Sequence, residues 1–210
     1  MTQIKTSAPG KLFIISAASG TGKTTLVTAL VKDLPGVIHS ISTTTRAMRD
    51  GEMHGVHYNF VTVAEFNAMV ARRAFYEHAE VHGNCYGTSR EWVEAKLASG
   101  QDVILEIDWQ GAAQMRQLMP ACVTVFILPP SITALELRLR GRGKDSEAVI
   151  QRRLAAATGE IAHASDYDYL IINDELDQAL AELKAVFLAE RCKAEVQGQR
   201  HAAQLRELLR

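Results

Sequence analysis

The sequence predicts an α/β protein with a central parallel sheet. Short apolar runs of strand length recur along the chain, at 12–15, 102–108, 123–128 and 169–172. Stretches with apolar residues at helical spacing lie between them, and alternating strands and helices are typical of parallel sheets with right-handed crossovers. Ligands of such sheets bind beyond the carboxyl ends of the strands. We therefore expect the functional residues just after these runs.

Composition excludes several classes of protein. The 210 residues are 47% hydrophobic and 22% charged, which is ordinary for a globular domain. A net charge of -1 gives no overall basic field for binding nucleic acid. The three cysteines are widely separated and odd in number, which argues against a disulfide framework and for a reducing compartment. Since we find neither a signal peptide nor a run long enough to span a bilayer, we expect a cytoplasmic protein without a membrane partner.

The stretch 16–25 is a candidate phosphate-binding loop. It lies between an expected strand and an expected helix, which is the context that such a loop requires. Gly20 and Gly22 let the backbone curl so that successive N–H groups point at anionic oxygens, and the helix presents its positive end to the same point. Lys23 can reach the outer phosphates, and the Thr24 hydroxyl can ligate Mg²⁺. The alternative is a turn that only caps a helix, and Ala17 stands where the usual loop begins with glycine.

The segment 40–95 is rich in turns and short strands, and we interpret it as an insertion outside the parallel core. Thr62 with Glu65 and Thr88 with Glu91 have the spacing of capping boxes, which predicts a helix that begins directly after each threonine. The elements expected from the loop onward are a helix to 34, a strand at 37–42, a polar loop at 43–52, a strand at 58–61, a helix to 72, a strand at 75–81, a turn at 83–87 and a helix ending before 100.

The rest of the chain returns to the parallel pattern. The tail through residue 210 alternates charges, so we expect a solvated helix or a contact between subunits, and a homo-oligomer is left open. The expected elements are a strand at 102–108, a helix at 112–119, a strand at 123–128, a basic stretch at 137–144, a strand at 169–172 and an amphipathic helix from 176 to about 196.

Two groups of charged residues accompany the candidate loop. Glu106 and Asp108, separated by one residue on an expected strand, point to the same face and suit Mg²⁺ or a hydroxyl-bearing substrate. A solvated strand end is the alternative. Arg138, Arg142 and Arg153 can neutralise the charge that phosphoryl transfer spreads over phosphate oxygens. The glycines beside Arg142 indicate a mobile segment, whereas the alternative is a solvated basic helix face.

The insertion carries residues that can bind a second nucleotide with a single phosphate. Glu77 is the candidate for base recognition, because a carboxylate accepts from the N1 and N2 donors of guanine and repels the N1 acceptor of adenine. Two arginines can clamp a phosphate bidentately, and hydroxyl groups can complete the pocket. Taken singly, each residue is also compatible with an ordinary loop or sheet position. The other candidates are Ser42, Arg46, Arg49, Tyr58, Tyr86 and Thr88.

In their order along the chain, these motifs resemble the guanylate kinase family of ATP-dependent GMP phosphotransferases over nearly the whole length. The resemblance implies a three-layer P-loop NTPase core with a parallel sheet, an inserted GMP-binding α+β lobe and a short helical lid. It implies Mg²⁺-dependent transfer of the ATP γ-phosphoryl group to GMP, giving GDP and ADP. The implied core is 1–39, 97–130 and 161–210, the lobe 40–96 and the lid 131–160. The matching stretches are 19–26, 42–49, 51–52, 58–60, 83–88, 106–111, 129–131, 141–143 and 173–174.

The resemblance also implies roles by position. Met48 departs from the family where proline is common, and Glu106 where some members have aspartate, which leaves the distance from its carboxylate to the metal open. The implied catalytic residues are Lys23, Arg138, Arg142 and Arg153. The implied ATP-binding residues are Ala17, Ala18, Ser19, Gly20, Thr21, Gly22, Lys23, Thr24, Thr25 and Asn173. The implied GMP-binding residues are Ser42, Arg46, Arg49, Tyr58, Glu77, Tyr86, Thr88 and Asp108. The implied metal ligands are Thr24 and Glu106.

Two other functions compete with this interpretation. Binding modules of guanylate-kinase-like type in scaffold proteins lose phosphate-loop residues, whereas Gly22, Lys23 and Thr24 are all present here. A kinase for another nucleoside monophosphate is the second alternative, and Glu77 argues against adenine as the acceptor base.

Overall fold

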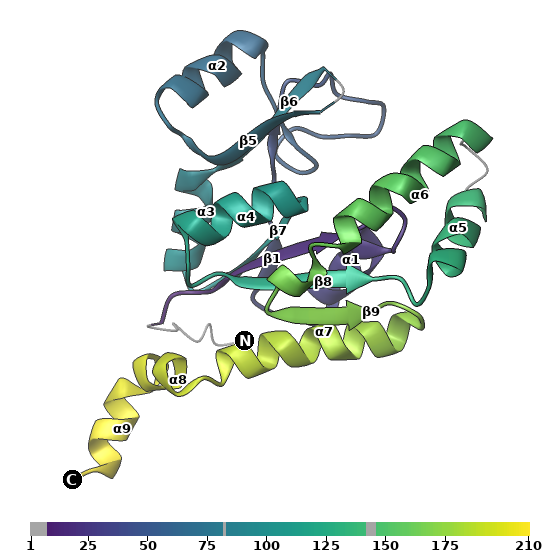
Figure 1. The fold of residues 1–210 in the computed structure, drawn as a ribbon. Coiled ribbons are helices and arrows are strands. Elements are labelled where there is room, and N and C mark those ends of the chain that lie inside the picture. Colours follow the sequence, from purple (N-terminus) through teal and green to yellow (C-terminus); the bar gives the residue numbers. More distant parts are fainter. Residues whose placement is uncertain (1–7, 82, 142–145) are drawn as a thin grey trace.

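A computed structural model of the chain describes residues 8–81, 83–141 and 146–210. Its strands form two sheets, one parallel with five strands in the order β2-β7-β1-β8-β9 and one mixed with four strands in the order β4-β3-β6-β5. The parallel sheet consists of β1 (Leu12–Ala17), β2 (Val37–His39), β7 (Asp102–Glu106), β8 (Val123–Leu128) and β9 (Tyr169–Ile172). The mixed sheet consists of β3 (Thr43–Thr44), β4 (Asn59–Phe60), β5 (Phe75–Val81) and β6 (Asn84–Ser89). The predicted parallel core and separate inserted lobe are confirmed (Figure 1).

The helices of the described ranges follow the strands in alternation over most of the chain. They are α1 (Lys23–Asp33), α2 (Val63–Ala71), α3 (Arg90–Ala98), α4 (Trp109–Leu118), α5 (Ile132–Gly141), α6 (Glu147–Ile161), α7 (Leu176–Arg191), α8 (Ala194–Arg200) and α9 (Ala202–Leu208). A short 3₁₀ turn at Ala164–Asp166 connects α6 to β9.

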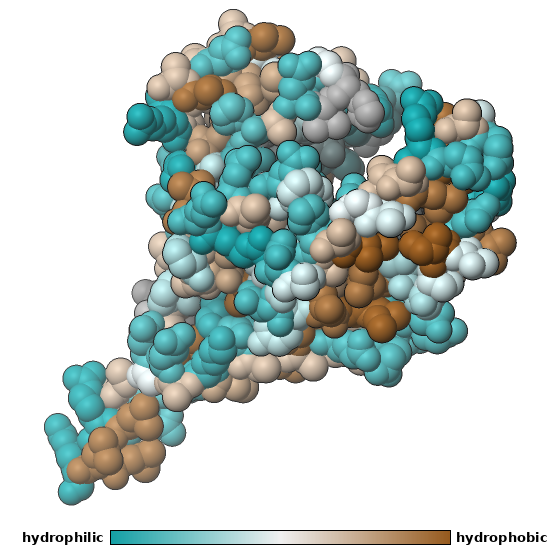
Figure 2. Space-filling model, in the orientation of Figure 1, coloured by the Kyte–Doolittle hydropathy of each residue, from teal (hydrophilic) through white to brown (hydrophobic). Residues whose placement is uncertain are grey.

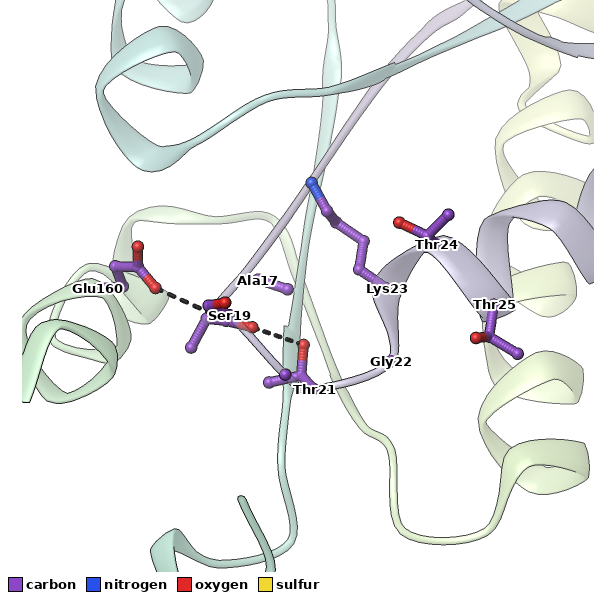
Figure 3. Close-up of a pocket in the computed structure, with 10 residues that line it drawn as sticks. Ala17, Ser19, Thr21, Gly22, Lys23, Thr24, Thr25 and Glu160 are labelled. Carbon is purple, nitrogen blue, oxygen red and sulfur yellow. Dashed lines mark hydrogen bonds between the residues drawn. The ribbon is translucent and has the colours of Figure 1, made fainter. Parts of the chain in front are cut away.

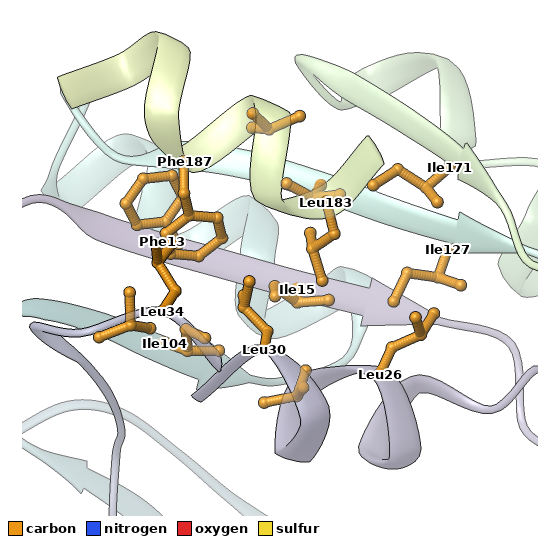
Figure 4. Close-up of a cluster of buried hydrophobic side chains, with 14 of the residues drawn as sticks. Phe13, Ile15, Leu26, Leu30, Leu34, Ile104, Ile127, Ile171, Leu183 and Phe187 are labelled. Carbon is orange, nitrogen blue, oxygen red and sulfur yellow. The ribbon is translucent and has the colours of Figure 1, made fainter. Parts of the chain in front are cut away.

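The parallel core has three layers because the central strand β1 buries both of its faces. Phe13 and Ile15 belong to an apolar cluster with α1 and α7, whereas Leu12 and Ile14 belong to a second cluster with α3 and α4. This division follows from the two-residue period of a strand. In the first cluster the ring of Phe187 from α7 stacks on Phe13 at 3.6 Å (Figure 4). The two packed faces fix the position of the loop that follows β1.

The lobe confirms one predicted capping box and corrects the other. Thr62 caps α2 and exchanges hydrogen bonds with Glu65, as predicted. The prediction for Thr88 is wrong, because Thr88 lies in β6 and Ser89 is the N-cap of α3. The backbone of β6 is held by pairing with both β3 and β5, so the helix begins only after the strand ends.

The predicted turn at 83–87 is also wrong beyond its first residue. Gly83 has a positive φ of 74° and belongs to the turn, but β6 begins at Asn84. Gly87 lies within β6 for a packing reason: a Cβ there would lie 2.9 Å from the ring of Phe75. That ring in turn stacks on Phe66 of α2. Glycine at this position therefore permits close packing and does not mark a chain reversal.

Other predicted boundaries also shift. The strand expected to reach 108 ends at Glu106, because Asp108 caps α4 through Gly111 N–H at 2.8 Å. The strand expected at 37–42 ends at His39. The last long helix ends at Arg191, and α8 and α9 continue as exposed helices that extend away from the core (Figures 1 and 2). Over the described residues, none of the helices combines the length and apolarity needed to cross a bilayer.

The helices α5 and α6 pack together beside the end of β1. Leu135 and Leu139 of α5 meet Ile150 and Ala157 of α6, and this small cluster includes Ala18 of the predicted phosphate loop. The basic stretch predicted at 137–144 thus begins on a helix that contacts the loop. Its residues 142–144, including the predicted Arg142, lie outside the described residues.

Candidate active site

The predicted phosphate loop forms a pocket of about 320 Å³ at the carboxyl end of β1 (Figure 3). Gly20 and Gly22 have positive φ angles of 97° and 94°, a region that residues with a Cβ rarely adopt. Ala17 is not among the described residues of positive φ, so alanine is tolerated where glycine is usual. The lining residues of the pocket are Ala17, Ala18, Ser19, Gly20, Thr21, Gly22, Lys23, Thr24, Thr25 and Glu160.

The back of the loop is held by Asn173, which follows β9 and is buried. Its amide Nδ2 donates to the Thr21 carbonyl at 2.6 Å. A Cβ on Gly22 would lie 2.6 Å from the same nitrogen, so Gly22 is required for space as well as for conformation. Arg138 donates to the carbonyl of Asn173 at 2.8 Å and to that of Asp174 at 3.2 Å. The structure therefore places both residues against the loop backbone, and their predicted contacts with ATP stay predictions.

A polar cluster at the start of α1 contains the predicted metal ligands. The Thr24 hydroxyl donates to Glu106 Oε2 at 3.1 Å, and Lys23 Nζ lies 3.7 Å from the same oxygen. His39 Nε2 lies 3.2 Å from Glu106 Oε1. Burial lowers the pKa of Lys23, and the charge of Glu106 opposes that change. Burial raises the pKa of Glu106, but His39 and Lys23 outweigh it and hold that pKa below its ordinary value.

The oxygen donors of this cluster fit Mg²⁺, which prefers hard ligands in octahedral geometry. One carboxylate and one hydroxyl, Glu106 and Thr24, lie within hydrogen-bonding distance of each other. The structure, where it describes the chain, gathers no group of three or more His, Cys, Asp and Glu side chains that could enclose a metal alone. Phosphate oxygens and water would therefore have to complete the coordination, as is usual for Mg²⁺ bound with a nucleotide.

Two side chains of helix α6 form hydrogen bonds with Ser19 at the rim of the loop. Arg153 Nη2 donates to the Ser19 hydroxyl at 2.7 Å. The Ser19 N–H donates to Glu160 Oε2 at 3.2 Å, and burial raises the pKa of Glu160. Sequence reasoning did not predict Glu160. One feature of the sequence could have pointed to it. Glu160 lies seven residues after Arg153, and this separation places both side chains on one face of a helix.

The lobe brings together the residues predicted for a second phosphate. Arg46 donates to Glu52 Oε1 at 2.7 Å, and its guanidinium lies 5.2 Å from the ring centre of Tyr58. The rings of Tyr58 and Tyr86 meet edge-on at 6.0 Å. The other oxygen of Glu52 accepts the Arg49 N–H at 2.8 Å. These hydrogen bonds lower the pKa of Glu52 to about 2, and the one from Arg46 has the largest effect. Glu52 had no predicted role, although it lies in a stretch that matches the family.

The residues predicted for base recognition lie deeper in the lobe. The Thr88 hydroxyl donates to Glu77 Oε1 at 2.7 Å. Burial raises the pKa of Glu77, the Thr88 hydrogen bond opposes this, and the charge of Asp108 adds to it. Asp108 is thus electrostatically coupled to Glu77 although it caps α4. Over the described chain, Glu77 Oε2 has no hydrogen-bond partner, so it is free to accept from a ligand.

A second pocket, of about 250 Å³, joins the two halves of the site. Lys23, Thr24 and Glu106 line it from the core, and Ser42 and Tyr58 line it from the lobe. Groups that suit a triphosphate and groups that suit a monophosphate therefore face a common space. Of the predicted site residues, only Arg142 lies outside the described ranges.

Comparisons with known proteins agree with this arrangement. Residues 9–190 match the family model described as guanylate kinase. The chain is 54% identical over 204 residues to guanylate kinase of Salmonella typhimurium, covering 96% of this chain and 99% of the relative. It is 56% identical over 202 residues to guanylate kinase of Hahella chejuensis, covering 96% and 97%. The crystal structure of guanylate kinase from Anaplasma phagocytophilum has a TM-score of 0.70 and 32% identity, covering 92% of this chain and 90% of that one.

Proposed function

Because this chain belongs to the guanylate kinase family, we propose a role for each of its site residues in the family's reaction. The chain transfers a phosphoryl group from ATP to GMP, and the products are ADP and GDP. The proposal concerns which groups hold each nucleotide, which hold the metal, and which segments move.

The phosphates of ATP bind in the pocket of the loop 17–25, where Lys23 neutralises the outer phosphates. Curled backbone at Gly20 and Gly22 supports this, because it directs N–H groups at an anion. Thr24 and Glu106 hold Mg²⁺, which when bound supplies the positive charge that phosphate oxygens need during transfer. Asn173 keeps the loop in shape from behind.

GMP binds in the lobe. Arg46 and Arg49 hold its phosphate with the Tyr58 and Tyr86 hydroxyls. Glu52 fixes the phosphate clamp before the nucleotide arrives, since its two oxygens bind the side chain of Arg46 and the backbone of Arg49. Base recognition belongs to Glu77, supported by Thr88, Ser42 and Asp108.

Transfer requires the two phosphates to approach in line with water excluded. We assign the core to 1–39, 97–130 and 161–210, the GMP lobe to 40–96 and a lid to 131–160. Arg138, Arg142 and Arg153 of the lid are the cations for the transferring group. The contact of Arg153 with Ser19 supports this, because it places a guanidinium at the rim of the phosphate loop.

The observation that carries the proposal is the pocket shared by Lys23 and Thr24 on one side and Ser42 and Tyr58 on the other. A pocket of this kind lets the donor and acceptor phosphates meet. We also assign the reaction to the reducing cytoplasm, because Cys85, Cys122 and Cys192 are free thiols.

The test is an ADP-release assay with Mg²⁺, ATP and a panel of acceptors: GMP, dGMP, AMP, UMP and dTMP. We expect turnover with GMP and dGMP, since the proposed contacts read the base and the phosphate and do not involve the 2′-hydroxyl. Equal turnover with AMP would contradict the assignment of Glu77. Glu80→Gln is the control, because Glu80 is exposed on the same strand as Glu77. Loss of turnover in this variant would show that changes on this strand affect activity without acting through the proposed base pocket.

A further inference from the structure

His39 is one of the polar residues that line the shared pocket without a part in the function proposed above. His39 is the last residue of β2, an edge strand of the parallel sheet. It lines the pocket of about 250 Å³ together with Lys23, Thr24 and Glu106. Its neighbour in the strand register is Ile104 of β7, and Glu106 follows two residues later on the same face. The sheet therefore places the imidazole beside the Glu106 carboxylate.

The two oxygens of Glu106 have different neighbours. Oε1 lies 3.2 Å from His39 Nε2. Oε2 accepts from the Thr24 hydroxyl at 3.1 Å and lies 3.7 Å from Lys23 Nζ. An ionised carboxylate has no hydrogen to give, so the contact with His39 is a hydrogen bond only when Nε2 carries the hydrogen. His39 is then the donor, and it determines which oxygen faces the phosphate loop.

Glutamate needs such a partner at this place. Its terminal torsion has a broad energy profile, so the chain alone does not fix the plane of the carboxylate. The Glu106 side chain is only 13% exposed, whereas that of His39 is 47% exposed. Water therefore reaches the carboxylate poorly, and protein donors have to orient it. Without His39, the donors left around the carboxylate among the described residues are Thr24 and Lys23, both on the side of Oε2.

We propose that His39 is a positioning residue for phosphoryl transfer: it donates to Glu106 Oε1 and thereby holds Oε2 toward Thr24 and the metal-binding end of ATP. This role rests on the proposed function, in which Glu106 and Thr24 are the metal ligands. Partners that hydrogen-bond a ligating carboxylate commonly change metal affinity by about 10–100-fold. His39 acts through Glu106 and need not touch either nucleotide.

The test uses a matched pair of substitutions. In His39→Gln the amide nitrogen reaches the place of Nε2, whereas in His39→Asn the side chain is too short to reach Glu106. Both replacement side chains are polar, and position 39 is half-exposed, so both variants should fold. Thermal unfolding checks this. Glu106→Gln tests the metal site itself. His201→Ala, at an exposed position of the tail, is the control.

The main measurement is the affinity of each full-length protein for an ATP analogue with a methylene bridge between the β and γ phosphorus atoms, with and without Mn²⁺. The electron paramagnetic resonance signal of Mn²⁺ reports the bound metal. We expect His39→Asn to reduce the gain in affinity that Mn²⁺ gives by about tenfold or more. We expect His39→Gln to stay within about threefold of the unchanged protein, and the KM for GMP to stay the same in both variants.

The outcomes separate the two hypotheses. If Glu106→Gln leaves the effect of Mn²⁺ unchanged, the proposed metal site is wrong and the role of His39 is overturned with it. If Glu106→Gln removes that effect while His39→Asn does not, the metal site stands and the positioning role is overturned. Equal losses in His39→Gln and His39→Asn would also overturn it, because a donor at the Nε2 position would then not be what matters.

Discussion

Replacing Glu77 with glutamine tests base recognition and folding in one variant. The carboxyl lies in the lobe with Oε1 bound to Thr88, which leaves Oε2 for a ligand. In the proposed complex, guanine N1–H and N2–H donate to it. In Glu77→Gln the amide oxygen keeps the Thr88 hydrogen bond, so the NH₂ group is turned toward the base. A donor then faces the two donors of guanine.

The expected loss follows from these contacts. One charge-assisted hydrogen bond contributes about 1.5–3 kcal/mol, and an unsatisfied donor costs about 1–3 kcal/mol. Together they predict a loss of about 2.5–6 kcal/mol, a fall on the order of 10²-fold or more in kcat/KM for GMP. Adenine N1 is an acceptor, so the amide should improve kcat/KM for AMP. The preference for GMP over AMP should therefore fall by more than the activity with GMP.

The same variant should be more stable without ligand at neutral pH. Burial raises the pKa of Glu77 above its ordinary value of 4.5. At pH values between 4.5 and the raised pKa of the folded state, the folded protein binds more protons than the unfolded chain. The free energy of unfolding therefore falls as pH rises through this window. Above it the buried charge has its full unfavourable effect, which glutamine removes. The melting temperature of Glu77→Gln should exceed that of the unchanged protein at pH 7, and the difference should close as pH falls below 4.5.

Steady-state kinetics with GMP and AMP and thermal unfolding at several pH values check both results. Glu80→Gln is the control, because Glu80 lies on the same strand but is exposed. Unchanged selectivity in Glu77→Gln would refute the assignment of the base pocket. A lower melting temperature at pH 7 would refute the electrostatic reasoning, since the carboxylate would then be stabilising the lobe.

Three further changes test other parts of the structure. Lys23→Ala should abolish GDP formation without lowering the melting temperature, and an active variant would contradict the phosphate-loop assignment. Glu160→Gln removes a negative charge from the mouth of the loop, so the KM for ATP should fall by about threefold to tenfold; an unchanged KM would mean that the carboxylate leaves before ATP binds. Phe187→Ala empties the position stacked on Phe13 and should lower the free energy of unfolding in urea by about 3–5 kcal/mol, whereas a loss below about 1 kcal/mol would mean that α7 repacks.

The parallel core could be predicted from the sequence because its signals are local. Buried strands such as β1 and β8 are continuous apolar runs, and the loop after β1 has glycines where the backbone needs positive φ. The same reasoning failed at Gly87, because glycine permits either a turn or a close approach and the sequence does not distinguish them. Only the ring of Phe75, twelve residues away, explains the choice.

The residues that sequence reasoning missed act through distant partners. Glu160 meets Ser19 from 141 residues away, and His39 was one of seven histidines without a metal-binding pattern. Its contact with Glu106 depends on the pairing of β2 with β7, which local periodicity does not reveal. Arg138 shows the opposite case: its charge was predicted to act on phosphate, whereas its described hydrogen bonds go to backbone carbonyls, that of Thr21 in the loop and those of Asn173 and Asp174 behind it.

The position of the lobe in the chain would let it move relative to the core, as the proposed transfer between two bound nucleotides requires. The chain leaves the core after His39, at the carboxyl end of β2, and returns through α3, whose Val93 packs in the core beneath the sheet. Bending at these two connections would move the lobe without breaking any strand pair of the parallel sheet. Lys23, Thr24, His39 and Glu106 all lie on the core side of the bend. The groups assigned to the metal would thus keep their geometry while the groups assigned to GMP approached them.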